Sequence, residues 1–264
     1  MLWEGLARYP GHLPARALPV KERLDQALVS RGLVVSRARA RDLILRGQVV
    51  VDGAVAHKPS QKVGPQARLG LPPGAGDYVS RGALKLRGAL AHFEVPVAGR
   101  IGLDVGASTG GFTEALLEAG AVKVYAIDNG RGQLHPRLAG DPRVVSIEDF
   151  DARDLGRAEI PEPVGIIVSD VSFISLEKAL PAALALAAPG AWLVALIKPQ
   201  FEAEPGRVPR NGVIVDAAVH AQACEKVRAW LAALPGWQVR GIVESAIKGG
   251  DGNTEFLIGA VHDG

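Results

Sequence analysis

Two lysines and two acidic residues in this chain have ionisable side chains that could transfer a proton, and they lie in distinctive sequence motifs. Each stands in its own short motif, YVSRGALKL, VSDVSFISL, LIKPQFE or GNTEF. Only nine of the 30 Lys and Arg residues are lysine, so lysine at two of these positions calls for an explanation. An arginine keeps its proton at working pH, whereas a desolvated lysine can release it. The four candidates for proton chemistry are Lys85, Asp170, Lys198 and Glu255.

A glycine-rich turn indicates a second site, one for a nucleotide-like cofactor. In IGLDVGASTGGFTEALLEAG an apolar strand ends at Asp104, and the chain then passes through glycines into a helix that begins near Phe112. Ligands of parallel sheets bind outside the carboxyl ends of the strands, and glycines let a ligand approach the backbone. The candidate cofactor contacts in this turn are Asp104, Gly106, Ser108, Thr109, Gly110, Gly111 and Phe112.

The turn differs from a dinucleotide-binding fingerprint. Where G-x-G-x-x-G has its second glycine this chain has Ser108, and the later glycine pair is shifted. A carboxylate at Asp104 would repel a diphosphate, but it suits the positively charged amino-acid end of S-adenosylmethionine. The next strand ends in Asp128, near the spacing at which a carboxylate meets ribose hydroxyls. The pattern is similar to the S-adenosylmethionine loop of Rossmann-like methyltransferases.

Further acids stand near the ends of later strands. In SIEDFDARDL either Asp149 or Asp151 could accept a hydrogen bond from the adenine amino group, and resemblance favours Asp151. Asp170 is expected to help hold the methyl-donor end of the cofactor. The alternative for the whole region is an ordinary glycine-rich turn with incidental acids at its strand ends.

Alternating apolar runs and helical stretches must position these groups. They predict an α/β fold in which a doubly wound, mostly parallel, seven-stranded Rossmann-like sheet has helices on both faces. Asp170 and Lys198 each follow an apolar run, so both should project from carboxyl ends of strands beside the cofactor. The expected strands are 101–105, 124–127, 144–147, 165–169, 192–197, 239–243 and 255–261.

A small basic module precedes this domain. Residues 21–62 carry nine Lys or Arg against four Asp or Glu, whereas the whole chain has a net charge of only +2. Helical spacing predicts two helices, the second opening at Ser36, and VVVDGAV predicts a hairpin. The stretch resembles the S4-type (alpha-L) RNA-binding domain, a small α+β fold; a solvated basic helix is the alternative. The expected RNA contacts are Arg23, Ser36, Arg37, Arg39, Arg41 and Arg46.

These patterns divide the chain into four parts: a loose extension (1–20), the RNA-binding module (21–63), a Gly/Pro-rich linker (64–77) and the large domain (78–264). The only cysteine, Cys224, excludes an internal disulfide and a cysteine zinc cluster, and no two histidines have metal-binding spacing. No apolar run is long enough to span a bilayer, and residues 1–20 do not read as a secretory signal. We expect a cytoplasmic protein without a metal or a membrane role, with a monomer favoured.

The four candidate residues and their motifs carry a family resemblance over about residues 21–261. A Lys, Asp, Lys, Glu tetrad on an α/β methyltransferase resembles the FtsJ class of RNA 2′-O-ribose methyltransferases. The basic module together with YVSRGALKL, LDVGASTGGFT, SDVSFISL, KPQFE and GN-x-EF resembles the TlyA (hemolysin-A-like) family. The resemblance implies S-adenosylmethionine as cofactor and cytidine 2′-hydroxyls in small- and large-subunit ribosomal RNA (rRNA) as targets. The linker and Asp151, where asparagine is common, depart from the family pattern.

The resemblance assigns a role to each of the four residues. A ribose 2′-hydroxyl is a weak acid, so its attack on a sulfonium methyl needs a base that is close and oriented. Lys198 is the expected base, with Asp170 orienting it and Lys85 and Glu255 positioning the hydroxyl. Desolvation and neighbouring lysine charge favour a neutral amine while neighbouring acids oppose it, so the sequence leaves that balance open. Two alternatives remain: structural ion pairs, and an RNA-binding, ribosome-associated factor whose methyltransferase domain is inactive.

Overall fold

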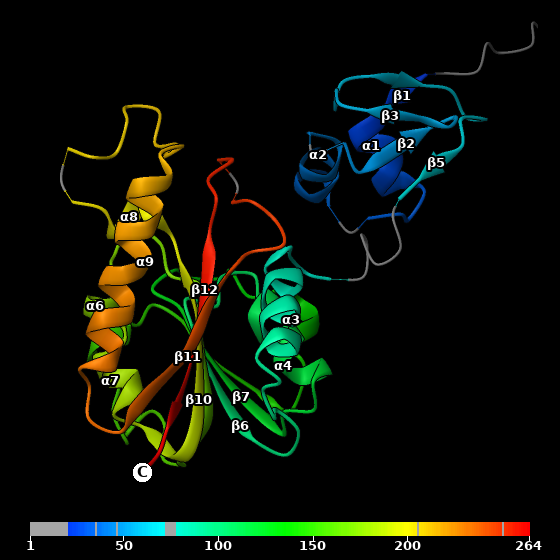
Figure 1. Ribbon diagram of the computed structural model, residues 1–264. Helices are drawn as coiled ribbons and strands as arrows, with labels where there is room; N and C mark the ends of the chain where they lie inside the picture. The colour runs from blue at the N-terminus through cyan, green and yellow to red at the C-terminus, as the bar shows by residue number, and fades with distance from the viewer. Residues whose placement is uncertain (1–20, 35, 46, 72–77, 205, 250) are drawn as a thin grey trace, which may run out of the picture. The chain divides into compact units, whose positions relative to one another are not determined.

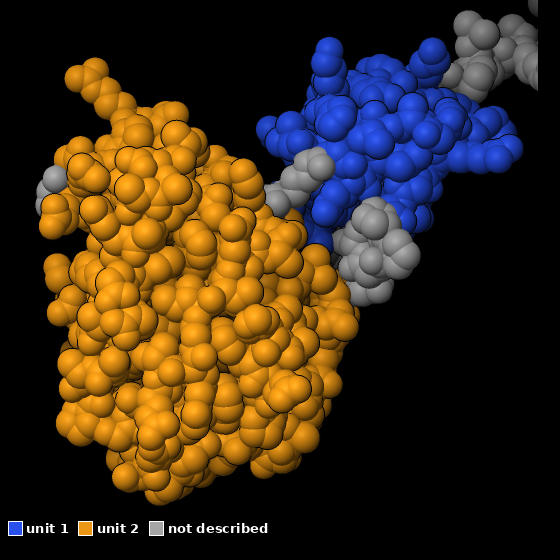
Figure 2. All heavy atoms as spheres, viewed as in Figure 1, with its two compact units in different colours: residues 1–77 blue, residues 78–264 orange. Residues whose placement is uncertain are grey.

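The computed structural model describes residues 21–264 except 35, 46, 72–77, 205 and 250. The chain forms two compact units, residues 1–77 (unit 1) and 78–264 (unit 2), which Figure 2 colours separately. The expected loose extension lies outside the described residues. None of the helices in the described part of the chain is long and apolar enough to cross a membrane.

Unit 1 combines two short helices with small antiparallel sheets. The apolar sides of the helices and of the valine-rich hairpin share one buried core, in which Leu24, Leu28 and Ile44 are fully buried. This arrangement confirms the predicted α+β module of two helices and a hairpin. Its elements are β1 (Glu22–Arg23), α1 (Leu24–Ser30), α2 (Arg37–Leu45), β2 (Val49–Val51), β3 (Ala54–Ala56), β4 (Lys62–Val63) and β5 (Leu69–Gly70).

The module extends further along the chain than the sequence indicated. Strand β5 pairs antiparallel with β2, so Val50 lies opposite Gly70 and Val51 opposite Leu69. These residues fall inside the segment 64–77 that was predicted to be a linker. Strand β5 thus lies beyond the expected boundary at residue 63. Leu69 and Gly70 can pair because both keep a backbone N–H and C=O, whereas the prolines of this segment lack the N–H.

Unit 2 is built around a seven-stranded sheet. Its strands are β6 (Ile101–Val105), β7 (Lys123–Ile127), β8 (Val144–Ile147), β9 (Val164–Ser169), β10 (Ala187–Ile197), β11 (Trp237–Glu244) and β12 (Phe256–His262). Its helices are α3 (Gly82–His92), α4 (Gly111–Glu118), α5 (Pro136–Ala139), the 3-10 turn η1 (Ala152–Asp154), α6 (Leu176–Ala179), α7 (Pro181–Leu184), α8 (Pro199–Glu202) and α9 (Ala217–Ala232).

The strands follow the order β11-β12-β10-β9-β6-β7-β8. All neighbouring pairs from β10 to β8 are parallel, and β12 runs antiparallel to both β10 and β11. The predicted mostly parallel, seven-stranded sheet is confirmed. Parallel strands require long crossover connections, and helices supply these connections on both sides of the sheet.

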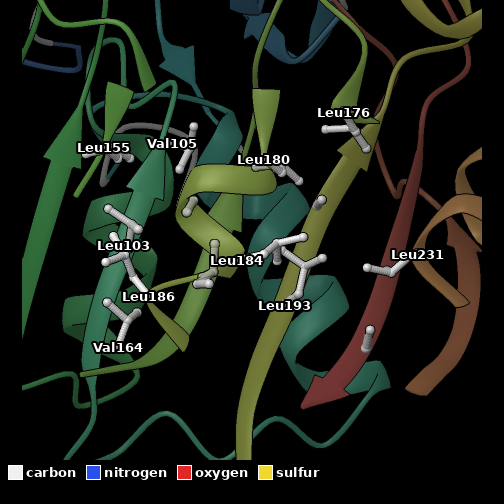
Figure 3. Close-up of a cluster of buried hydrophobic side chains, with 14 of the residues drawn as sticks. Leu103, Val105, Leu155, Val164, Leu176, Leu180, Leu184, Leu186, Leu193 and Leu231 are labelled. Carbon is white, nitrogen blue, oxygen red and sulfur yellow. The ribbon is translucent and has the colours of Figure 1, made fainter. Parts of the chain in front are cut away.

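Helices cover both faces of the sheet and bury its central strands. Figure 1 shows α3 and α4 on one face and α6, α7 and α9 on the other. Along β10, Leu193 and Ala195 belong to the core under α6, α7 and α9, whereas Val194 and Leu196 belong to the core under α3 and α4. Figure 3 shows the first of these cores, with Leu193 near Leu184. Burial on both faces explains why the central strands read as continuous apolar runs.

A cavity in the first core should destabilise unit 2. Leu103 on β6 is fully buried, so Leu103→Ala should lower the unfolding free energy by about 2 to 5 kcal/mol. Urea unfolding followed by tryptophan fluorescence reports mainly on this unit, because Trp192, Trp230 and Trp237 lie in it. Val122→Ala, at a residue that is 53% exposed, is the matched control and should change stability by less than about 0.5 kcal/mol. Equal effects of the two substitutions would contradict the assigned core.

Candidate active site

The glycine-rich turn between β6 and α4 has a backbone that glycine alone adopts readily. Gly106 and Gly110 have φ angles of +84° and +94°, and Ser108 between them has +48°. A Cβ atom at Gly106 would lie 3.2 Å from the Asp170 carbonyl oxygen and from the Val171 Cα atom. The turn therefore lies directly against the segment that follows β9, and a side chain at residue 106 would force the two apart.

A cavity of about 390 Å³ opens beside this turn. It is walled by the carboxyl ends of β6 and β7, by η1 and by the segment after β9. Its mixture of apolar walls and a few acids is typical of a site for a nucleoside-like group. Its lining residues include Gly106, Asp128, Asp151, Ser172 and Phe173.

Two of the expected cofactor acids stand at the wall of this cavity. The carboxylate oxygens of Asp128 accept hydrogen bonds from the backbone N–H groups of Ser108 and Gly130, both at 2.7 Å. Asp151 accepts hydrogen bonds from Arg153, which hold the pKa of its carboxyl down at about 2. Both acids are thus held in fixed orientations beside the cavity, and Asp151 is ionised at neutral pH.

Asp104 has a different environment from the one expected. It is fully buried, its Oδ2 accepts a 2.7 Å hydrogen bond from the Thr113 hydroxyl, and its Oδ1 has no hydrogen-bond partner among the described residues. Desolvation by burial is the largest influence and raises the pKa of this carboxyl to about 7. Asp104 and Gly110 line neither of the two cavities described here, unlike the remaining predicted residues of the turn.

A second cavity, of about 260 Å³, lies on the other side of the turn. It shares Gly106 and Ser172 with the first cavity. Three of the four candidate proton-transfer residues line it, and they come from α3, from the end of β9 and from the end of β10. The residues that wall it are Ser80, Arg81, Gly82, Lys85, Gly106, Ala107, Ser108, Thr109, Gly111, Phe112, Asp170, Ser172 and Lys198.

The four candidate residues form two ion pairs. Lys85 Nζ lies 2.5 Å from Glu255 Oε2, and both side chains are buried. Lys198 Nζ lies 2.7 Å from Asp170 Oδ1, in a more exposed position. Glu255, which the sequence placed at the start of the last strand, comes directly before β12. The arrangement brings both lysines to one cavity with an acid beside each.

Sequence reasoning missed Ser172, the other contact of Lys198. The Nζ atom of Lys198 donates a hydrogen bond of 2.7 Å to Ser172 Oγ. Serine is common in loops, so its presence in VSDVSFISL did not indicate a functional residue. The only sequence feature that could have indicated one is that Ser172 lies two residues after Asp170. The next residue, Phe173, is 90% exposed and has a φ angle of +64°.

Sequence reasoning also missed Glu202, a buried acid that joins the motifs of Asp170 and Lys198. Its Oε1 accepts a 2.7 Å hydrogen bond from the backbone N–H of Leu176, where α6 begins after the Asp170 segment. Lys226 Nζ donates to the Glu202 carbonyl oxygen at 3.0 Å. Desolvation by burial is the largest influence on the carboxyl of Glu202 and raises its pKa. The only sequence feature that could have indicated its role is that Glu202 follows Lys198 by four residues, which is one helical turn.

The expected RNA contacts of unit 1 differ in exposure. Arg23 and Arg37 are partly or largely exposed and both pair with the buried Asp25. The Ser36 hydroxyl accepts from the backbone N–H of Arg39, so it caps helix α2. Arg41 is exposed and Arg46 lies outside the described residues.

Arg39 does not fit the expectation of a phosphate contact. Its side chain is only 8% exposed and lies 3.6 Å from Asp42 one turn along α2. Successive arginines in SRARAR are two residues apart, so they point to different sides of a helix. Arg39 lies on the buried side of α2.

Comparison with known proteins bears out the family resemblance. The model of FtsJ-like methyltransferases matches residues 78–261, and the S4 domain model matches residues 22–69. The chain belongs to the FtsJ-like methyltransferase family. The 16S/23S rRNA (cytidine-2'-O)-methyltransferase TlyA of Mycobacterium tuberculosis is 44% identical over 239 residues, which are 90% of this chain and 89% of that protein.

Two further relatives of this FtsJ-like methyltransferase carry a different name. Hemolysin A of Brachyspira hyodysenteriae is 40% identical over 89% of this chain and 98% of its own length. A solved structure of a hemolysin-named protein from Streptococcus thermophilus superposes with a TM-score of 0.72 at 39% identity, covering 93% of this chain and 90% of that one. The tandem of an S4 domain and a methyltransferase domain therefore spans nearly the full length of these relatives.

The residues at the two cavities fit S-adenosylmethionine. Gly106 lines both cavities without a side chain to fill them, and Asp128 presents a fixed carboxylate to the larger cavity. The smaller cavity adjoins it and holds the two lysines. A nucleoside-like donor in one cavity and a hydroxyl acceptor in the other would meet at the boundary that Gly106 and Ser172 form.

The raised pKa of Asp104 predicts a pH-dependent stability. Its carboxyl titrates at about 7 when folded instead of 3.8, so from pH 4 to 7 the folded protein holds a proton that the unfolded chain has released. Stability therefore falls as the pH rises through this window, by at most about 4 kcal/mol from this group. Asp104→Asn keeps an acceptor for Thr113 without a titrating proton, so its unfolding free energy in urea should vary less from pH 4 to 7 than that of the unaltered protein.

The control for this experiment is Asp154→Asn, at an exposed acid of η1. It should leave the pH dependence of stability unchanged. If Asp104→Asn and the unaltered protein show the same pH dependence, the carboxyl of Asp104 is not held neutral by burial.

Proposed function

We propose that this protein transfers the methyl group of S-adenosylmethionine to a ribose 2′-hydroxyl of RNA, with cytidine in rRNA as the target. The observation that carries this proposal is the lysine pair at the smaller cavity, with Asp170 beside Lys198 and Glu255 beside Lys85. The cavity adjoins the one that fits the cofactor. It thus offers a basic amine where a hydroxyl acceptor would lie next to a methyl donor.

Lys198 is the base in this proposal. S-adenosylmethionine supplies an electrophilic methyl group, and the acceptor hydroxyl must lose its proton as it attacks. The amine of Lys198 stands at the cavity wall, partly shielded from solvent, and is held by Asp170 Oδ1 and Ser172 Oγ. Asp170 also follows β9 directly, so the same carboxylate can orient the base and bind the donor end of the cofactor.

Lys85 has a different role because its position is deeper. Its ammonium is paired with Glu255 at 2.5 Å, and both side chains are nearly inaccessible to solvent. A buried pair of this kind holds its geometry firmly, since separation would leave a charge uncompensated. We assign Lys85 and Glu255 to positioning the ribose hydroxyl beside Lys198.

The choice of RNA as substrate follows from unit 1 and from the relatives. Unit 1 matches the S4 domain and presents the exposed Arg41 on α2. The M. tuberculosis relative is named for cytidine-2'-O methylation of 16S and 23S rRNA, and a Campylobacter jejuni relative that is 33% identical is named for 23S rRNA alone. These names support rRNA and cytidine for this chain, and they make both subunits the substrates to test first.

Substitution of the base tests the reaction. Lys198→Ala should reduce tritiated methyl transfer from S-adenosylmethionine to unmethylated ribosomal subunits by at least about 100-fold. Lys198→Arg should be comparably inactive, because arginine keeps the positive charge but does not release its proton. Lys178→Ala, at an exposed lysine of α6 outside both cavities, is the matched control and should keep full activity.

Three outcomes would count against the proposal. Undiminished transfer by Lys198→Ala would exclude this lysine as the base. Methyl groups recovered on bases, with none on ribose after nuclease digestion, would exclude the 2′-hydroxyl as the acceptor. If the unaltered protein binds ribosomal subunits without methylating any RNA, a binding factor with an inactive methyltransferase domain is the better description.

The role of unit 1 has its own test. Arg41→Ala should weaken binding to ribosomal subunits several-fold at 0.1 M salt and should reduce the slope of log affinity against log salt by about 1, as expected for one lost phosphate contact. Arg68→Ala, at an exposed arginine next to β5, is the control on the same unit and should leave the slope unchanged. An unchanged slope for Arg41→Ala would remove this residue from the RNA contacts.

A further inference from the structure

Ser172 stands at the boundary between the two cavities. Gly106 and Ser172 are the residues that line both, and because glycine has no side chain, Ser172 contributes the polar side chain shared by the two walls. A methyl group that passes from a donor in one cavity to an acceptor in the other must cross this boundary. The Ser172 hydroxyl therefore lies near the reacting atoms in the proposed function.

The hydroxyl of Ser172 is bound to the proposed base. Lys198 Nζ has two polar contacts of equal length, 2.7 Å to Ser172 Oγ and 2.7 Å to Asp170 Oδ1. An ammonium group has three N–H bonds, whereas a neutral amine has two N–H bonds and one lone pair in roughly tetrahedral directions. Among the described residues only the Ser172 contact is a hydrogen bond, and Asp170 Oδ1 approaches the amine as an ion-pair partner without one. With one direction taken by the Ser172 bond and a second by Asp170, the lone pair has only the third direction left to it.

We propose that Ser172 is a positioning residue, whose hydroxyl accepts an N–H of the neutral Lys198 amine and, together with Asp170, directs its lone pair at the substrate hydroxyl. The inference rests on the proposed function and names a residue that its tetrad does not contain. Without Ser172 the amine can rotate about its Cε–Nζ bond, and its lone pair points at the substrate for only part of the time.

The proton and electron balance of the step is complete. The proton passes from the 2′-hydroxyl to the lone pair of Lys198 Nζ, and the hydroxyl oxygen forms a bond to the methyl carbon. The carbon–sulfur bond breaks with its electron pair retained on sulfur, which leaves S-adenosylhomocysteine. Ser172 is exposed, so the new ammonium proton has solvent next to it for the return to the neutral amine.

The loop that carries Ser172 is held against the element that follows Lys198. The Phe173 ring lies 5.1 Å from the ring of Phe201 on α8. Glu202 on the same helix accepts the Leu176 N–H at 2.7 Å. Both contacts lie within four residues after Ser172, so they tie its loop to α8, the helix that directly follows Lys198.

Ser172→Ala removes the hydroxyl and tests the inference. The single-turnover rate, measured with saturating S-adenosylmethionine and unmethylated ribosomal subunits, should fall by about 10- to 100-fold. The dissociation constants of S-adenosylmethionine and of the subunits should stay within about twofold, because the lost contact is to Lys198. Ser172→Thr restores a hydroxyl at the same Oγ position and should recover most of the rate.

The matched control is Ser175→Ala, three residues further along the same loop. Ser175 precedes α6 without a side-chain capping hydrogen bond and lines neither cavity. It should keep the full rate, and thermal unfolding should show that all three variants are as stable as the unaltered protein. A loss of rate in Ser175→Ala as well would assign the effect to the loop and overturn the role of Ser172.

Two further results would overturn the inference while leaving the proposed function intact. The first is an undiminished single-turnover rate for Ser172→Ala. The second is weaker S-adenosylmethionine binding with an unchanged rate at saturation, which would make Ser172 a cofactor contact. Failure of the proposed function is separate and visible, because the unaltered protein would then transfer no methyl group to ribose.

Discussion

The parallel pairing of β6, β9 and β10 is the constraint on which the site depends. Val105 at the end of β6 lies opposite Ser169 at the end of β9, and Ser169 in turn pairs with Ala195 of β10. The cofactor turn, the Asp170 segment and the Lys198 segment leave the sheet from this one edge. A shift of register by a single residue would reverse every side chain between the two cores, so burial on both faces fixes the edge firmly.

The charges at this edge are arranged in pairs with different exposure. Lys85 and Glu255 are buried together, whereas Lys198 and Asp170 are partly open to the cavity. Buried ion pairs contribute little net stability because desolvation offsets most of the attraction. Their presence beside a cavity is therefore better explained by geometry: Glu255 holds Lys85 in a fixed position, and Lys198 with Asp170 stays accessible from the cavity.

Much of this arrangement follows from local patterns in the chain. Apolar runs of four to seven residues predict the strands, and an acid or a lysine directly after such a run is predicted to lie at the carboxyl edge. Asp170, Lys198 and Asp128 were placed correctly at this edge for that reason. The burial of Arg39 and the pairing of β5 with β2 did not follow from such patterns, because helix rotation and backbone pairing depend on what each segment packs against.

The sequence by itself determined the residue types, the strand ends and the family motifs, since periodicity and turn chemistry are properties of neighbouring residues. Only the tertiary structure decided which acid pairs with which lysine, because Lys85 on α3 meets Glu255, just before the start of β12, across 170 residues of chain. It also decided that Asp104 is buried and lines neither cavity, that Ser172 contacts Lys198, and that Glu202 joins α8 to the start of α6. These relations depend on distances between segments, and no local pattern encodes such a distance.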